Sequence, residues 1–251
     1  MAGNDKYINW EAAVALGKSG GNEAWNIFGY NEDAGTNLRA MWYRGDTTDY
    51  VFPPAAQIMQ VKSTNAADTM PLLIQGLDAN YDRISETVTL AGTSIVSTTK
   101  EYLRLNGAII LAGSNAGTID IGDDLGGTPT YYKGIRPGDG RCQDSISTIP
   151  RGYQFALYRI DAFSADGTAA KPAVFRNYVA NELGRILNVA RTTFFNNMNI
   201  QRRIPFVYAE KTDIQFQLSS ISGSHEMGVF GEGVLHEMDN QEHLNNREQG
   251  W

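Results

Sequence analysis

Apolar and polar residues alternate in short segments between residues 85 and 122, and this pattern constrains the fold more than any other feature of the chain. The segments 85–96, 100–105 and 117–122 are rich in β-branched and aromatic residues, and glycine and asparagine turns interrupt the stretch at short intervals. Successive side chains of a strand point to opposite faces of a sheet. The pattern is therefore typical of antiparallel strands with one buried face.

The same pattern continues along most of the chain, with short turns between the segments. Further strands are expected at residues 38–44, 57–62, 72–75, 102–112, 145–149, 153–163, 174–179, 186–195, 204–208, 212–218 and 227–235. Helices do not alternate with these segments, which excludes the βαβ order of a nucleotide-binding sheet. The sequence predicts an all-β fold, an antiparallel β-sandwich resembling a jelly roll.

Residues 1–37 depart from this pattern. Residues 10–17 favour a short helix, and the aromatic residues Trp25, Phe28 and Tyr30 then stand among asparagine, glycine and aspartate. Aromatic residues in a polar segment are natural anchors for another surface. We predict a mostly irregular N-terminal contact arm over residues 1–37. The alternative is that these aromatic side chains pack back on their own domain.

The remaining chain divides into a predicted β-sandwich core at residues 38–238 and a polar C-terminal tail at residues 239–251. Two sheet-rich halves of the core are expected to meet near residues 140–145. Intersubunit contacts are predicted at aromatic residues of the two polar ends, namely Trp10, Trp25, Phe28, Tyr30 and Trp251.

Charge and cysteine content narrow the choice of partners. The net charge of −7 argues against nucleic acid, because proteins that bind it neutralise phosphates with basic residues. Cys142 is the only cysteine, so a disulfide within the chain is excluded, which fits assembly in a reducing cytoplasm. The first residues lack a basic region followed by an apolar run, so no signal peptide is expected. The aliphatic run 108–112 is far too short to span a bilayer, so no membrane partner is expected.

Two clusters contain residue types that bind metals. The first comprises His236, Glu237, Asp239, Glu242 and His243. Its spacing misses the helical zinc motif, because asparagine stands where the second histidine is needed. The second comprises Asp120, Asp123 and Asp124, and it lacks the closing glutamate of a calcium loop. A solvated tail and a turn that bonds its own backbone are the expected roles. No metal or cofactor is predicted, although metal binding by either cluster stays open.

No catalytic constellation stands out, so no enzymatic activity is predicted. The segment 231–233, Gly-Glu-Gly, lies in a strand pattern and predicts a bulge or a close backbone approach. A sandwich can still bring two distant carboxylates together across a groove, as in some glycosidases. A carbohydrate-binding or glycan-cleaving module is therefore the alternative from another class.

Six short segments resemble virion structural proteins of tailed bacteriophages that infect aquatic bacteria. They are LDAN (77–80), LAGT (90–93), YLRLNGA (102–108), GTIDI (117–121), TIPRGY (148–153) and EKTDI (210–214). The resemblance covers roughly residues 57–235. It implies a β-sandwich subunit of the virion, assembled in the host cytoplasm and working through contacts with other virion proteins and further copies of itself. We expect a head decoration or cement protein that stabilises the capsid; a neck, tail or fibre-base component is the alternative.

Overall fold

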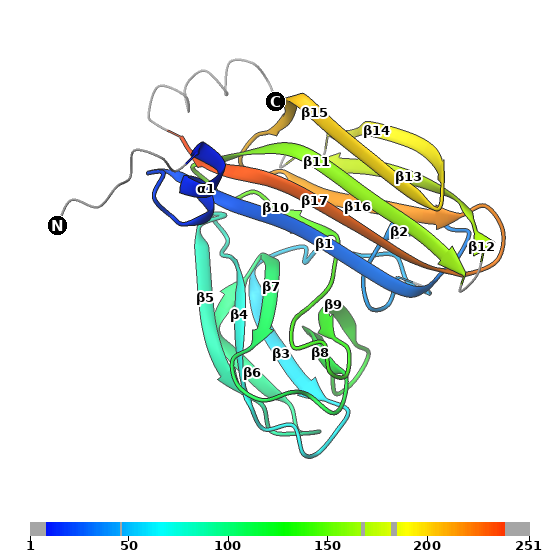
Figure 1. Ribbon diagram of the computed structural model, residues 1–251. Helices are drawn as coiled ribbons and strands as arrows, with labels where there is room; N and C mark the ends of the chain where they lie inside the picture. The colour runs from blue at the N-terminus through cyan, green and yellow to red at the C-terminus, as the bar shows by residue number, and fades with distance from the viewer. Residues whose placement is uncertain (1–8, 46, 167–168, 182–184, 239–251) are drawn as a thin grey trace.

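The chain folds into two antiparallel β-sandwiches, one large and one small (Figure 1). The computed structural model describes residues 9–45, 47–166, 169–181 and 185–238. Strands dominate this part of the chain, and one short helix, α1 (Trp10–Ala15), precedes them. The predicted all-β fold with antiparallel β-sandwich architecture is confirmed.

Two five-stranded sheets form the large sandwich. The first contains β1 (Asn22–Ala34), β17 (His225–Glu237), β11 (Tyr153–Asp166), β12 (Ala169–Ala170) and β15 (Asn197–Tyr208). In this sheet β15 pairs with β11. The second contains β10 (Ile146–Thr148), β16 (Asp213–Ser220), β13 (Pro172–Ala180), β14 (Ile186–Phe195) and β2 (Arg39–Ala40). β14 and β15 follow each other in the chain but do not pair with each other, so the β14–β15 segment that they form passes from one sheet to the other.

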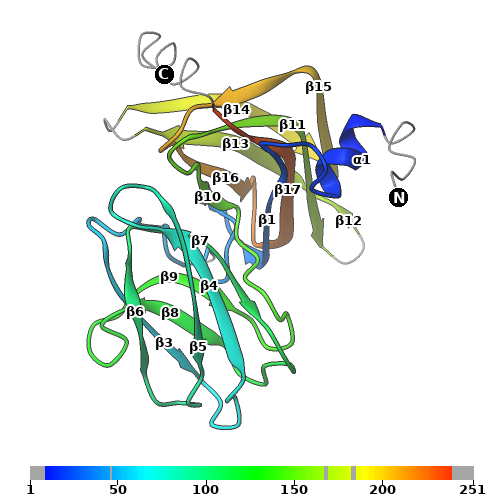
Figure 2. The same ribbon diagram turned by 90° about the vertical axis from the view of Figure 1, so that its left-hand side faces the viewer.

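The small sandwich has a four-stranded and a three-stranded sheet. The first contains β6 (Val96–Tyr102), β3 (Gln57–Ser63), β8 (Ile119–Asp123) and β9 (Thr130–Ile135). The second contains β5 (Arg83–Thr89), β4 (Pro71–Leu77) and β7 (Arg104–Ile110). Figure 2 shows the small sandwich on the side of the large one where β1 and β10 lie.

Alternation along the strands produces both cores. In β13 every second residue is buried, and its Phe175 packs with Phe216 of β16 at a ring-centroid distance of 6.1 Å. Gly231 of β17 lets this ring approach the backbone, because a Cβ there would lie 2.4 Å from the Phe216 ring. The close approach expected from the Gly-Glu-Gly segment is confirmed. A separate core, which includes Met59, lies inside the small sandwich.

The N-terminal segment differs from the predicted arm. The short helix is present, and the Asn9 side chain caps it by accepting a hydrogen bond from the Ala12 amide at 2.9 Å. Residues 22–34, however, form strand β1, which pairs with β17 and buries Ile27 in the core. Assigning this stretch to an irregular arm was wrong. Its glycine and asparagine content lowers its intrinsic strand preference, and pairing with a partner some 200 residues away in sequence overrides that preference.

The domain boundaries also need correction. The small sandwich, β3 to β9, is inserted between β2 and β10 of the large one, so the chain crosses between them twice. The boundary predicted near residues 140–145 coincides with the second crossing. The first crossing, between β2 and β3, was missed. Residues 38–238 are thus two sandwiches, and β1 completes the large one from outside that range.

Candidate functional site: the domain junction and the exposed β14–β15 segment

A buried ion pair joins the two sandwiches. Arg104 of β7 holds Asp213 of β16 through two parallel hydrogen bonds, Nε to Oδ1 at 2.8 Å and Nη2 to Oδ2 at 3.0 Å. The two side chains are 12% and 10% exposed. Thr148 Oγ1 donates to the same carboxylate at 2.6 Å, and Arg104 Nη1 donates to the Pro53 carbonyl at 3.0 Å. Two planar charged groups with this many partners fix the angle between the sandwiches.

An amide and a second arginine extend the junction on either side of this pair. Asn106 of β7 makes two 2.8 Å hydrogen bonds with the backbone N–H and C=O of Thr148, as if it were a further strand residue. Arg83 of β5 pairs with Glu23 of β1 at 3.0 Å. Its guanidinium also lies over the rings of Trp25 and Tyr153, 5.5 and 4.2 Å from their centroids. The large sandwich thus receives polar groups from two strands of the small one.

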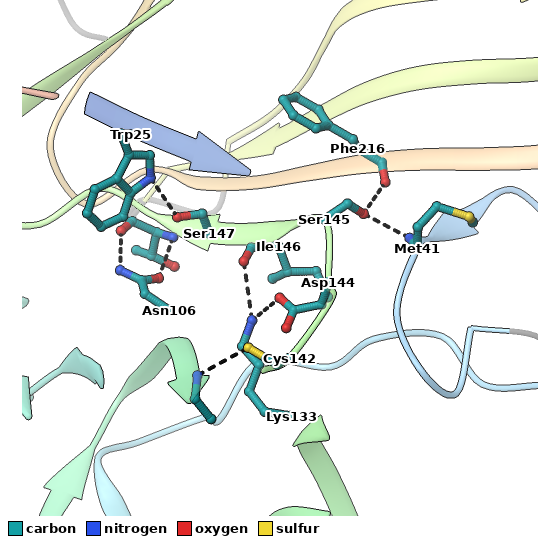
Figure 3. A network of polar contacts seen from close by, with 12 residues as sticks. Trp25, Met41, Asn106, Lys133, Cys142, Asp144, Ser145, Ile146, Ser147 and Phe216 are labelled. Atoms are coloured by element: carbon teal, nitrogen blue, oxygen red, sulfur yellow. Dashed lines mark hydrogen bonds and ion pairs between the residues drawn. The ribbon is translucent and has the colours of Figure 1, made fainter. Parts of the chain in front are cut away.

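Aromatic residues fill the space between the sandwiches. Trp42, Tyr50 and Phe52 stack edge to face, with centroids 5.3 and 5.0 Å apart. Ile146 of β10 packs in the same cluster. Close beside it, Lys133 of β9 reaches across to Asp144 in the second crossing (Figure 3). The junction is therefore densely connected, which favours one rigid body over two hinged domains.

The predicted contact residues do not form one surface. Trp10 lies on α1 and is 47% exposed. Trp25 faces the junction, where its Nε1 donates to Ser147 Oγ at 3.2 Å (Figure 3). Phe28 and Tyr30 follow on β1. The Tyr30 ring lies 6.3 Å from the ring of Phe163, and burial together with Glu226 raises the pKa of Tyr30 to about 12. Trp251 and the tail at 239–251 lie outside the described residues. A role of these residues in intersubunit contacts stays a prediction.

The candidate metal ligands are engaged elsewhere. Asp120 is buried and accepts hydrogen bonds from Tyr43 Oη at 2.9 Å and Arg44 Nη2 at 3.2 Å. Asp124 accepts from the Thr128 amide at 2.8 Å, the backbone-bonding turn that we expected. His236 Nδ1 lies 3.0 Å from Asn22 Oδ1 on the neighbouring strand. Within the described ranges no cluster of metal-binding side chains is present. Asp239, Glu242 and His243 lie outside those ranges.

A cleft runs along the junction beside Trp25. It encloses about 270 Å³ and is lined by Gln75, Asn106 and Arg141 in addition to Trp25. Amide and aromatic side chains of this kind can bind sugars. The indole of Trp25, however, already donates its N–H to the protein and has Arg83 near its ring. The cleft therefore offers a sugar ring little free aromatic face.

The β14–β15 segment is the most unusual surface among the described residues, and the sequence-based predictions missed it. Ile204 is 78% and Phe195 69% exposed, and Ile186 and Val207 are exposed as well. Residues 184–209 contain four arginines and no aspartate or glutamate, although the whole chain is acidic. Those arginines are Arg185, Arg191, Arg202 and Arg203.

Two arginines lie close together where the β14–β15 segment pairs with β13. Arg191 of β14 stands directly opposite Arg176 of β13. Burial and the neighbouring Arg191 lower the pKa of Arg176. Like charges opposite each other on paired strands are destabilising, and an anionic partner would relieve the repulsion. The signal that could have revealed the surface is the long stretch without a carboxylate in an acidic chain.

Comparisons with known proteins add little. No protein-family model matches the chain, and no curated protein matches it. Among solved structures, a T=1 particle derived from infectious bursal virus aligns with 90% of this chain and 79% of its own chain, at 8% identity and a TM-score of 0.12. A TM-score this low carries no argument about fold or function. In the part of the chain that the structure describes, no helix is long and apolar enough to cross a membrane.

Proposed function

We propose that the protein is a structural subunit of a bacteriophage virion, most specifically a head decoration protein that stabilises the capsid through surface contacts. The β14–β15 segment carries this proposal, because it presents large apolar side chains together with arginines and has no aspartate or glutamate from residue 184 to residue 209. An exposed apolar group next to charge of one sign is typical of a protein-binding surface. Its partner is an acidic surface of another virion protein.

The domain junction supports a mechanical role. A subunit that transmits load between neighbours must not bend at its own domain boundary. Arg104, Asn106 and Arg83 hold the two sandwiches through paired hydrogen bonds and ion pairs, and an aromatic cluster packs between them. The sequence resemblance to virion structural proteins points to the same role, without enzymatic activity.

The binding experiment uses purified recombinant chain and virions that lack it. Cosedimentation measures how much chain the particles take up, and electron microscopy locates it. Ile204→Asp introduces a charge at the most exposed apolar side chain and should weaken binding about 10-fold or more, as expected for an interface hot spot. Ile95→Asp changes an exposed isoleucine of the small sandwich and serves as the matched control. Raising the salt concentration should weaken binding by screening the arginines.

Three outcomes would contradict the proposal: no uptake by the particles, absence of the chain from native virions by mass spectrometry, or equal binding by Ile204→Asp and wild type. Location at the neck, tail or fibre base would support the alternative virion role. A signal on a glycan array that is lost on mutating Trp25 or Gln75 in the junction cleft would instead support the carbohydrate-binding alternative.

A further inference from the structure

Lys133 and Asp144 form a buried pair at the domain junction. Lys133 lies on β9, and none of its side-chain surface is exposed. Asp144, two residues before β10, has a side chain only 6% exposed. Lys133 Nζ contacts Asp144 Oδ1 and lies 3.3 Å from the carbonyl oxygen of Ile146 (Figure 3). Ile146 belongs to the aromatic cluster with Trp42, so the pair stands in apolar surroundings.

As an ordinary ion pair, the two groups would be poorly satisfied. A lysine ammonium has three N–H donors, and only two acceptors, Asp144 Oδ1 and the Ile146 carbonyl, are assigned to it. Asp144 Oδ2 is buried and has no hydrogen-bond partner among the described residues. Burying two charges is costly unless the remaining donors and acceptors are bonded. An uncharged product would remove this cost.

We propose that Lys133 and Asp144 condense to an intramolecular isopeptide bond. Within the pair, one proton passes from the Lys133 ammonium to the Asp144 carboxylate, and the lone pair of Nζ then attacks Cγ of the carboxyl group. The bond from Nζ to Cγ forms, and the bond from Cγ to the hydroxyl oxygen breaks. One proton moves from Nζ to the departing hydroxyl group, which leaves as water, so no oxidant, reductant or co-reactant is needed.

The product matches the donors and acceptors around it better than the ion pair does. The amide keeps one N–H on Nζ, and the Ile146 carbonyl oxygen is in place to accept it. One carboxyl oxygen departs with the water, so the unpartnered charge on Asp144 disappears. The Lys133 and Asp144 side chains are 0% and 6% exposed, which limits the water that can reach the tetrahedral intermediate, although Asp144 lines the junction cleft.

Cys142 is suited to a positioning role beside this pair. Burial and the neighbouring Asp144 raise the pKa of the Cys142 thiol to about 12, so it stays protonated at neutral pH. Its Sγ accepts a hydrogen bond from the Ala108 amide at 3.1 Å, which fixes the side chain (Figure 3). A neutral thiol there can donate a hydrogen bond to the oxygen of Asp144 that gains negative charge during the attack.

The cross-link goes beyond the proposed virion role and does not depend on it. It would fasten β9 of the small sandwich to the segment that enters β10 of the large one. The second crossing between the sandwiches would thereby be closed covalently, which adds to the noncovalent contacts of Arg104 and Asn106.

Intact-mass spectrometry of the denatured full-length protein tests the proposal. The expected mass is lower than that of the sequence by one molecule of water. Tryptic digestion should leave residues 105–141 joined to residues 142–151, with no cleavage after Lys133, and fragmentation should place the link at Lys133 and Asp144. A succinimide at Asp144 would also lose water but would join no peptides, and that result would overturn the proposal.

Variants separate the cross-link from its surroundings. Lys133→Met and Asp144→Ala should each show the full sequence mass. Asp144→Asn should still form the same link, with ammonia leaving in place of water. Cys142→Ala should slow the appearance of the cross-linked mass in freshly refolded protein, and Cys142→Ser should restore much of the rate. Lys62→Met removes a different inward-bonded lysine and should retain the link. Full sequence mass in folded wild type after prolonged incubation would overturn the proposal, whatever the variants do.

Discussion

Replacing Arg104 with alanine tests whether the two sandwiches are held together as one body. The substitution leaves the carboxylate of Asp213 nine-tenths buried and opposite no cation, with Thr148 as its remaining described side-chain partner. Removing one member of a buried, hydrogen-bonded ion pair costs about 3–5 kcal/mol, because the other charge stays buried without compensation. The hydrogen bond to the Pro53 carbonyl is lost as well. We expect the free energy of unfolding to fall by an amount in that range.

Urea denaturation followed by tryptophan fluorescence measures this loss. Arg151→Ala is the matched control, since Arg151 makes an ion pair with Asp82 across the same junction at 2.6 Å, with side chains 51% and 41% exposed. An exposed pair is worth about 0–1 kcal/mol. A double-mutant cycle with Asp213→Ala then isolates the coupling between Arg104 and Asp213, and the double variant should recover part of the single-variant loss.

The result that would refute the reasoning is an Arg104→Ala variant no less stable than Arg151→Ala. In that case burial would not distinguish the two pairs, and the junction would not depend on Arg104. A second prediction concerns the shape of the transition. With the junction intact, both sandwiches should unfold together, whereas Arg104→Ala should separate them into two transitions.

Three further changes test the packing and titration described above. Gly231→Ala should lower the free energy of unfolding by about 1–3 kcal/mol, because the added Cβ would meet the Phe216 ring. Gly35→Ala is the control: its added Cβ meets no atom within 4 Å, so the free energy of unfolding measured in urea titrations should change by less than about 0.5 kcal/mol. Cys142 should resist alkylation by iodoacetamide at about pH 8 in the folded protein and react on unfolding, because burial raises its pKa to about 12. The protonated thiol contributes to the free energy of unfolding, and this contribution is complete below the ordinary pKa of 9.0. It should be lost as the pH rises toward 12, so Cys142→Ala should lose less free energy of unfolding than wild type over that range. Burial opposes ionisation of Glu86, but hydrogen bonds from the Lys100 and Thr99 amides outweigh this effect and lower the pKa of the carboxyl group. The ionised Glu86 therefore stabilises the fold above the ordinary pKa of 4.5, and this contribution is lost as the pH falls below it. Glu86→Gln should lose less free energy of unfolding than wild type over that pH range.

Strand positions could be predicted from the sequence because burial in a sheet leaves a local trace. In β13 each inward residue is apolar or, like Asn177, finds a partner inside, and the outward residues alternate with them. Apolar alternation in the sequence also placed β11, β14 and β16, although β14 proves to be mostly exposed and β16 is buried throughout. It failed for β1, where Trp25, Ile27 and Gly29 share one face but the surrounding asparagine and glycine obscured the pattern.

Pairing over long sequence distances left no such trace. The partner of β1 is β17, and the partner of Arg104 is Asp213, more than 100 residues away. Nothing near Arg104 in the sequence distinguishes it from Arg151, whose ion pair is exposed. Hence the strands could be predicted, but the inserted sandwich and the junction could not. The aromatic residues chosen as contacts were divided by the same long-range pairing, with Trp25 turned toward the junction.

The location of the β14–β15 segment links the proposed contact surface to the domain junction. The segment belongs to the large sandwich and contributes a strand to each of its sheets, where β14 pairs with β13 and β15 pairs with β11. A force applied to Ile204 or Phe195 is therefore distributed over both sheets. It reaches the small sandwich through β16 and β10, where Asp213 and Thr148 meet Arg104 and Asn106. A flexible junction would let the small sandwich rotate relative to the large one, and the force would then not be transmitted between them. The buried pair at Arg104 and the cross-link at Lys133 both act at the point where such rotation would occur.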